Sequence, residues 1–417
     1  MKKLLCLISL LLVVDQVRSD DSYARAEEAL RSKLLDNYNR YALPDKKTVV
    51  TFTGLEVREF TMKEKEHEMQ IYGWLKHKWD DPRLQWEASD HSNIQQLGVD
   101  PESIWKPDLS LYNAEHKENV VMHFDSQAII FASGNVLHVP PCNLRFHCIM
   151  DLTYWPHDVH NCTLKIGSWI HSGLVLDIVL EKYEVTGMST EDDDFNPKTN
   201  LSGRDFEITD WNVQRSSKFY DCCTEPYVSV TTSFIVRRIA PAYDWTVKLP
   251  VVCLCLLTLV LFMLPPGAGE KVLFGGVCLI LDFLYLNYVT NEVNHAPTHT
   301  PLIVQLLGQQ IVLVLASVFV SAIVLRMAKG PHNTGLPLFM KGSITGLAKF
   351  LLLGNYINDD SSPKSDDTEL GSSKDLGQSA SSNTCEWIML AAIVDRLSLI
   401  LYLSICIITL IRFNSVL

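Results

Sequence analysis

The first residues that could do chemistry are Cys148 and Cys162, at the ends of CIMDLTYWPHDVHNC. A disulfide between them would close a loop of about 15 residues, which stabilises a fold by roughly 3 kcal/mol by lowering the entropy of the unfolded chain. Such a bond is ordinarily a structural staple. The enclosed Trp155, Pro156 and Asp158 add a bulky, stiff tip, so the loop could also connect two parts of the chain mechanically.

The second group of reactive residues lies in YDCCTEPY, from Tyr220 to Tyr227. Cys222 and Cys223 are adjacent, and a bond between neighbours strains a small ring because their Cα atoms are only about 3.8 Å apart. Two unrelated cysteines in a loop are the alternative. The flanking tyrosines and Pro226 favour a bonded pair at the tip of a stiff hairpin, with the two tyrosines as an aromatic cap.

The start of the chain indicates an oxidising compartment for these cysteines. Residues 1–19 join a basic start to an apolar run, which is typical of a secretory signal peptide, and disulfides persist in secreted proteins. Asn161 and Asn200 begin glycosylation sequons and fit an exposed surface. The cysteines between the signal and the first long apolar stretch are odd in number, and we expect Cys142 to be the one left over.

Two patterns divide the part of the chain that must position these residues. A short amphipathic helix is predicted over residues 26–41, and from Thr48 to about Arg238 short runs of β-branched and aromatic residues predict an antiparallel β-sandwich. Four apolar stretches follow, each near the roughly 20 residues that a helix needs to cross a bilayer. They are Val247–Pro265, Val272–Val289, Leu302–Leu325 and Ile388–Ile411.

Charge gives the orientation of these stretches and excludes some functions. The loop between the third and fourth stretches holds several Lys and Arg residues, and the loop between the second and third has none. Loops rich in Lys and Arg face the cytoplasm, so we expect both termini to lie outside the cell. A net charge of −12 disfavours nucleic acid and suits the attraction of cations. We find no Ser/His/Asp arrangement, zinc signature or phosphate loop, so we expect no enzyme, no cofactor and no metal site.

The cysteine spacing and the Trp-Pro-x-Asp core resemble the signature loop of the pentameric Cys-loop receptors. The motif from Tyr220 to Tyr227 resembles the ligand-covering loop of alpha-type nicotinic acetylcholine receptor subunits. This resemblance implies an extracellular antiparallel β-sandwich with a short N-terminal helix, followed by an all-α four-helix transmembrane bundle, assembled as a pentamer. The disulfides that it implies are Cys148–Cys162 and Cys222–Cys223.

The same resemblance implies an aromatic box for the ligand. For any single aromatic residue the alternative is core packing, and we expect Trp79 and Trp86 to be core. Ser172 stands where the family usually has an aspartate that ties neighbouring loops together. The residues implied to bind ligand are Tyr112, Trp169, Tyr220, Cys222, Cys223 and Tyr227, with Trp74 offered by the complementary face of a neighbouring subunit.

Further residues are implied to couple the ligand site to the membrane. Arg238, just before the first apolar stretch, corresponds to a family arginine that pairs with a hairpin glutamate, here Glu64. An ordinary membrane-flanking arginine is the alternative. Trp155, Pro156 and Asp158 at the tip of the cysteine loop complete the coupling set.

The second apolar stretch carries a stripe of residues implied to line a pore. Just before this stretch, Gly269-Glu270-Lys271 resembles the sequence of the family's cation-selective channels, in which Glu270 would contribute to a ring of carboxylates. Leu273 and Val277 are apolar where the family is usually polar, and Asp282 lies off the stripe, where an ionisable residue is expensive unless it is buried among helices. Residues three and four apart share a helix face, and the stripe consists of Leu273, Val277, Ile280, Leu284, Asn287 and Asn291.

We therefore expect an acetylcholine-gated cation-channel subunit of the plasma membrane, postsynaptic, that binds acetylcholine or a related quaternary ammonium agonist and assembles with other nicotinic receptor subunits. The alternative is a modulatory or ligand-binding subunit that conducts poorly on its own. The expected boundaries are signal peptide 1–19, ligand-binding domain 20–242, transmembrane helices 243–330, partly disordered cytoplasmic loop 331–385, and last helix with a short extracellular tail 386–417.

Overall fold

The computed structural model describes residues 22–114, 126–187, 203–221, 223–239, 241–293, 299–330 and 374–413, and scattered residues between 332 and 353. The chain forms two compact units, one comprising Met1–Met150 and Val159–Ile239 and the other Asp151–Asp158 and Ala240–Leu417. The predicted signal peptide, the sequon at Asn200, Cys222 and most of the predicted cytoplasmic loop lie outside the described residues.

The first described element of the first unit is a helix over residues 22–35, which ends before the predicted residue 41. The chain turns there, and the Tyr38 hydroxyl donates a hydrogen bond of 2.6 Å to Asp81. The strands follow the predicted runs of β-branched and aromatic residues. They are β1 (Thr48–Lys63), β2 (Glu68–Asp80), β3 (Gln96–Val99), β4 (Leu109–Leu111), β5 (Ala128–Phe131), β6 (Asn135–His138), β7 (Pro141–His147), β8 (Val159–Ser168), β9 (Leu176–Gly187), β10 (Phe206–Lys218) and β11 (Tyr227–Arg238).

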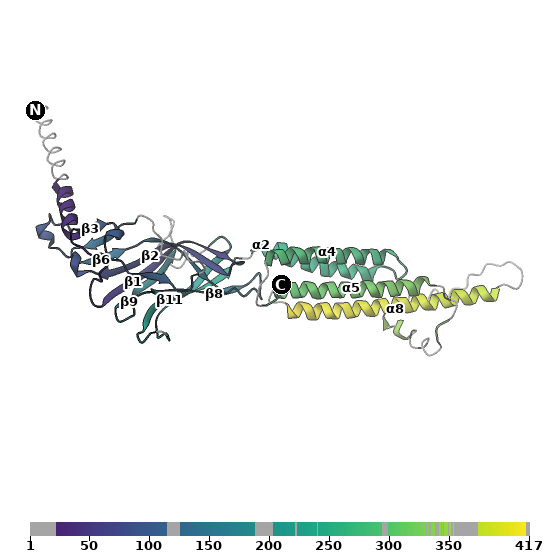
Figure 1. Ribbon diagram of the computed structural model, residues 1–417. Coiled ribbons are helices and arrows are strands. Elements are labelled where there is room, and N and C mark those ends of the chain that lie inside the picture. Colours follow the sequence, from purple (N-terminus) through teal and green to yellow (C-terminus); the bar gives the residue numbers. More distant parts are fainter. Residues whose placement is uncertain are drawn as a thin grey trace, which may run out of the picture. The chain divides into compact units, whose positions relative to one another are not determined.

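These strands form two sheets, seen in the β-rich part of Figure 1. The larger sheet has the order β3-β5-β6-β2-β1-β9, with β7 also paired to β2, and the smaller has the order β10-β11-β8-β4. All strand pairs are antiparallel except β1 with β9, which is parallel. Short 3-10 helices connect some strands, at Pro82–Leu84, Ala88–Asp90 and Pro101–Ser103.

The core of this unit lies between the two sheets because alternate side chains of each strand face inward. Phe146 of β7 and Phe234 of β11 meet across it with ring centroids 6.4 Å apart. Trp79 is 2% exposed, which confirms its prediction as core, and Trp86 packs, partly buried, against the same cluster. A disulfide joins Cys148, after β7, to β8.

The tip of the disulfide loop, Asp151–Asp158, belongs to the helical unit. Leu152 and Trp155 are buried there in an apolar cluster formed mainly by the helices. The Trp155 ring packs edge-on against Tyr243, with centroids 4.9 Å apart. Leu152 and Trp155 are therefore stabilised mainly by residues of the helices, which follow the β-sandwich in the sequence.

The second unit is helical, and in Figure 1 α4, α5 and α8 run side by side. The described residues contain four helices that are long and apolar enough to cross a membrane, as predicted, spanning Pro241–Met263, Glu270–Val293, Leu302–Lys329 and Asn383–Arg412. The elements are α2 (Pro241–Tyr243), a π-helical turn (Asp244–Lys248), α3 (Leu249–Met263), α4 (Glu270–Val293), α5 (Leu302–Lys329) and α8 (Lys374–Arg412).

Polar side chains are buried among these helices. Lys271 of α4 and Asp395 of α8 form an ion pair that is almost completely buried. Gln310 of α5 donates to the Tyr402 hydroxyl of α8 at 3.1 Å. Asp282 of α4 is also buried, which agrees with the expectation for an ionisable residue outside the proposed pore-lining stripe. Neither of its carboxylate oxygens has a hydrogen-bond partner in the described structure.

Candidate functional site

Three aromatic-rich loops of the sandwich converge on one pocket of about 540 Å³. The Tyr112 and Trp169 rings meet edge-to-face with centroids 6.1 Å apart, and the Tyr220 and Tyr227 rings do so at 5.9 Å. The structure thus brings together the four aromatic residues proposed for the principal face. The pocket is lined by Tyr112, Asn113, Lys165, Trp169, Tyr220, Cys223 and Tyr227.

Strands β4 and β8 fix the first pair of rings. The backbone N–H of Tyr112 donates to the Lys165 carbonyl at 2.8 Å, and the Tyr112 hydroxyl donates to the Ser168 carbonyl at 2.5 Å. Gly167 allows this approach, since a Cβ there would lie 2.7 Å from the Tyr112 ring. Partial burial raises the pKa of Tyr112 to about 12, so the phenol stays neutral and donates its proton. Trp169 remains 71% exposed, as a ligand-facing ring has to be.

The loop that carries Tyr220 and Tyr227 is tied to the loop after Trp169. The Ser172 hydroxyl donates to the Glu225 carboxylate, and the Gly173 N–H donates to the Pro226 carbonyl at 2.7 Å. The departure from the family aspartate at position 172 therefore does not remove the tie between these loops, because Glu225 supplies the carboxylate from the other side.

Two of the predicted ligand residues lie outside this arrangement. Cys222 is outside the described residues, so its bond to Cys223 remains a prediction, while Cys223 itself lines the pocket. Trp74 does not line the pocket; it lies half-buried on β2, opposite Glu56 of β1 and Pro141 of β7. A residue that serves a neighbouring subunit is expected to lie away from the pocket of its own chain.

The structure also places Arg238 beside Glu64. Their Nη1 and Oε1 atoms are 2.8 Å apart, and the side chains are 3% and 20% exposed. The guanidinium group lies 4.5 Å from the centre of the Phe206 ring. Separating a buried ion pair is costly because it leaves one charge without its partner. The pair therefore holds the end of β11, which carries Arg238, beside the turn after β1, which carries Glu64.

Comparison with known proteins identifies the family. The neurotransmitter-gated ion-channel ligand binding domain matches residues 27–240, a span that includes every strand of the described residues and the whole pocket. The chain belongs to the neurotransmitter-gated ion-channel family. This is not an enzyme family, which confirms the expectation that the chain is not an enzyme.

Similar proteins include neuronal acetylcholine receptor subunits. The alpha-2 subunit of Homo sapiens is 31% identical over 339 residues, covering 80% of this chain and 62% of that subunit. The alpha-5 subunit of Homo sapiens is 28% identical over 373 residues, covering 88% and 75%, and the alpha-4 subunit 28% over 338 residues, covering 80% and 52%. The chain spans less than two thirds of the length of the alpha-2 and alpha-4 subunits. At these identities it is a divergent relative of the family's alpha subunits.

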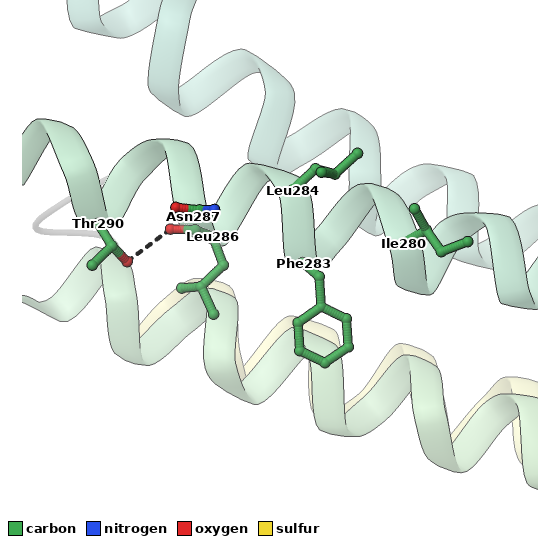
Figure 2. A pocket seen from close by; sticks show the side chains of 6 residues that line it. All are labelled: Ile280, Phe283, Leu284, Leu286, Asn287 and Thr290. Carbon is green, nitrogen blue, oxygen red and sulfur yellow. Dashed lines mark hydrogen bonds between the residues drawn. The ribbon is translucent and has the colours of Figure 1, made fainter.

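The proposed pore residues of this family member lie on one exposed side of α4. Leu273, Val277, Ile280 and Leu284 are between 46% and 72% exposed. Asn287 and Asn291 are also exposed and bond to each other at 3.0 Å. Glu270, exposed, begins the helix. A pocket on α4 is lined by Ile280, Leu284 and Asn287 of this side and by Phe283, Leu286 and Thr290. In Figure 2, Leu284 and Phe283 point in different directions from the helix.

Sequence reasoning missed four residues of the site, of which Asn113 lines the pocket next to Tyr112. Asp108 accepts hydrogen bonds from the Ser168 hydroxyl and from the backbone N–H after Trp169. It lies in WKPDLSLYN, the stretch from Trp105 to Asn113 that carries Tyr112, and this place could have indicated its role. Glu225 could not be recognised without knowing that its loop faces Ser172. Lys165 lies two residues before Gly167, and strand alternation places both on one face.

Proposed function

We propose that this chain is a subunit of a ligand-gated cation channel in the plasma membrane. The observation that carries the proposal is the convergence of Tyr112, Trp169, Tyr220 and Tyr227 on one pocket. Aromatic faces attract a quaternary ammonium group by about 0.5–2 kcal/mol per ring, and acetylcholine is the first ligand to test. Membership of the family and the similarity to neuronal acetylcholine receptor subunits support this choice.

The pocket belongs to the principal face, and a neighbouring subunit completes it with a residue such as Trp74. Closure of the loop from Tyr220 to Tyr227 on the ligand is passed to α4 through the disulfide loop and the Arg238–Glu64 pair. Glu270 contributes a ring of carboxylates that favours cations. Other nicotinic receptor subunits are the expected partners in a pentamer, with both termini outside the cell and a postsynaptic location.

A second function is favoured by the apolar residues of the pore stripe. Leu273 and Val277 are exposed on α4 and give permeating ions no polar groups. A subunit of this kind binds ligand and modulates a mixed channel while conducting poorly by itself.

Recording agonist-evoked current separates the two functions. Cells that express the chain alone and cells that also express an ordinary nicotinic partner are exposed to acetylcholine. Current in both cases supports the conducting subunit, and current only with the partner supports the modulatory one. Absence of any acetylcholine effect on current and on ligand binding would contradict both.

A further inference from the structure

The first membrane-spanning segment contains a proline that removes one hydrogen-bond donor from its backbone. Pro250 has no N–H, so the carbonyl of Thr246, four residues earlier, cannot accept the usual helical hydrogen bond from it. The turn before the proline, Asp244–Lys248, is π-helical, and the N–H of Leu249 donates to the Asp244 carbonyl, five residues earlier. Such turns are rare and often occur at functional sites.

A tyrosine of α4 supplies a donor in place of the missing N–H. The Tyr285 hydroxyl donates to the Thr246 carbonyl at 3.0 Å and to the Val247 carbonyl at 2.9 Å, so its single proton is shared between the two oxygens. A proline is tolerated in a membrane-spanning helix where a neighbouring helix satisfies the backbone group that it frees. The hydroxyl of Tyr285 satisfies this group here.

The same tyrosine belongs to a series of contacts that runs from the disulfide tip to the helix of the proposed pore stripe. Trp155 of the tip packs against Tyr243, the residue just before the π-helical turn. The ring of Tyr285 packs, partly buried, against the apolar cluster that contains Trp155 and Val247. On α4, Tyr285 directly follows Leu284 of the stripe. The π-helical turn therefore contacts the tip on one side and α4 on the other.

We propose that Tyr285 is a positioning residue for channel opening. Its hydroxyl replaces the N–H that Pro250 lacks and holds α4 to the π-helical turn, so a displacement of this turn is transmitted to the pore stripe. Because the proton is shared between two carbonyls of one turn, the bond can pass from one oxygen to the other as the helices shift. The gating role rests on the proposed function, whereas the hydrogen bond does not.

The chain offers a matched control for the hydroxyl of Tyr285. Tyr288 lies three residues later on α4, is 42% exposed and has its ring centroid 5.9 Å from that of Tyr285. Within the described part of the chain, its hydroxyl forms no hydrogen bond. Tyr285→Phe and Tyr288→Phe therefore remove the same atom from the same helix, and only the first removes the bond to the π-helical turn.

Unfolding temperatures of the full chain in detergent test the hydrogen bond. Tyr285→Phe should lower the unfolding temperature by about 1–3 °C because it leaves a carbonyl without a donor, and Tyr288→Phe should leave it unchanged. Pro250→Ala restores the N–H, so Tyr285→Phe should lower the unfolding temperature less in that background. An effect of Tyr285→Phe no larger than that of Tyr288→Phe would overturn the bond. Equal effects of Tyr285→Phe with and without Pro250 would overturn the replacement of the N–H.

Currents from cells that also express an ordinary nicotinic partner test the gating role. Tyr285→Phe should shift the half-maximal acetylcholine concentration roughly 3- to 10-fold, and Tyr288→Phe should shift it less than about 2-fold. A merely structural role would change surface expression and maximal current, measured in parallel, but not this concentration. An unchanged half-maximal concentration in Tyr285→Phe would therefore overturn the gating role.

Failure of this inference is distinguishable from failure of the proposed function. If acetylcholine has no effect on current or on ligand binding with the wild-type chain, the proposed function is refuted and the gating role of Tyr285 with it. The comparison of unfolding temperatures still decides whether the hydroxyl replaces the N–H of Pro250, because it requires no ligand and no current.

Discussion

At the scale of single residues, two tryptophans of the sandwich should respond to substitution in opposite ways. Trp79 is 2% exposed and Trp169 is 71% exposed. Trp79→Ala should lower the free energy of unfolding by about 3–5 kcal/mol because it leaves a cavity. Trp169→Ala should change stability by no more than about 0.5 kcal/mol but weaken quaternary ammonium binding roughly 5- to 30-fold.

Denaturant titration and ligand binding on the same preparations measure both effects. Equal losses of affinity in the two variants, after correction for the folded fraction, would count against the proposed box.

Cys142 is the residue for which burial predicts chemical inertness. It is buried on β7 and unpaired among the described residues, as its prediction as the odd cysteine requires. Burial raises the pKa of its thiol to about 12, so the reactive thiolate is absent at neutral and mildly alkaline pH. Iodoacetamide at about pH 8 should leave Cys142 unmodified in the native protein and label it after unfolding, as read by mass mapping. Labelling of the native protein would contradict the buried placement.

Site residues that lie in a local sequence motif could be predicted from the sequence. Site residues whose role depends on a contact with a distant part of the chain could not. Tyr112 is predictable because it lies in the stretch WKPDLSLYN, and Trp169 because it follows Cys162 at a spacing that resembles the family's. The Ser172–Glu225 bond and the lysine beside Tyr112 join residues from different loops or strands. No local pattern reports such a contact, because the loops meet only after the sheets have formed.

At the scale of elements, the residue pattern was sufficient to predict the strands, from short runs of β-branched and aromatic residues, and the four long helices, from apolar stretches of about 20 residues. It did not reveal that β1 pairs in parallel with β9, because both strands show the same inward and outward alternation in either direction. It also predicted too long an N-terminal helix, since the apolar spacing continues past residue 35 while tertiary contacts turn the chain.

The burial of Asp282 in α4 leads to a prediction about the stability of this element. Its two carboxylate oxygens have no partner in the described structure, and an unsatisfied buried polar group costs about 1–3 kcal/mol. Asp282→Leu should therefore raise the unfolding temperature of the full chain in detergent, whereas Asp282→Asn, which keeps a polar group, should change it little. A lower unfolding temperature for Asp282→Leu would mean that the carboxyl group makes a stabilising contact in the assembled protein.

At the scale of the whole molecule, the exposed stripe of α4 predicts how a channel made only of this chain would behave. In a pentamer, Leu273, Val277, Ile280 and Leu284 would form four consecutive apolar rings. A hydrated cation loses solvation in such a tube, and the wall of a helix offers no free carbonyl groups to replace it. We expect homomers to conduct poorly and mixed pentamers to conduct, because partner subunits supply polar groups at the same depth.

Leu273→Thr combined with Val277→Ser should raise the homomeric current without changing ligand affinity. Whole-cell recording of both versions, with surface expression measured in parallel, tests this. Strong cation current from unmodified homomers would refute the dry-pore argument.

The packing of the disulfide tip has a practical consequence for anyone who wants the sandwich as a water-soluble fragment. A gene truncated after Ile239 removes the helices but keeps Leu152 and Trp155, which are buried in the helical unit. The tip lies inside the loop that the Cys148–Cys162 disulfide closes, so the fragment would expose these two apolar side chains to solvent and self-associate. Replacing both side chains by polar ones should be the first step towards a secreted reagent for immunisation or crystallisation.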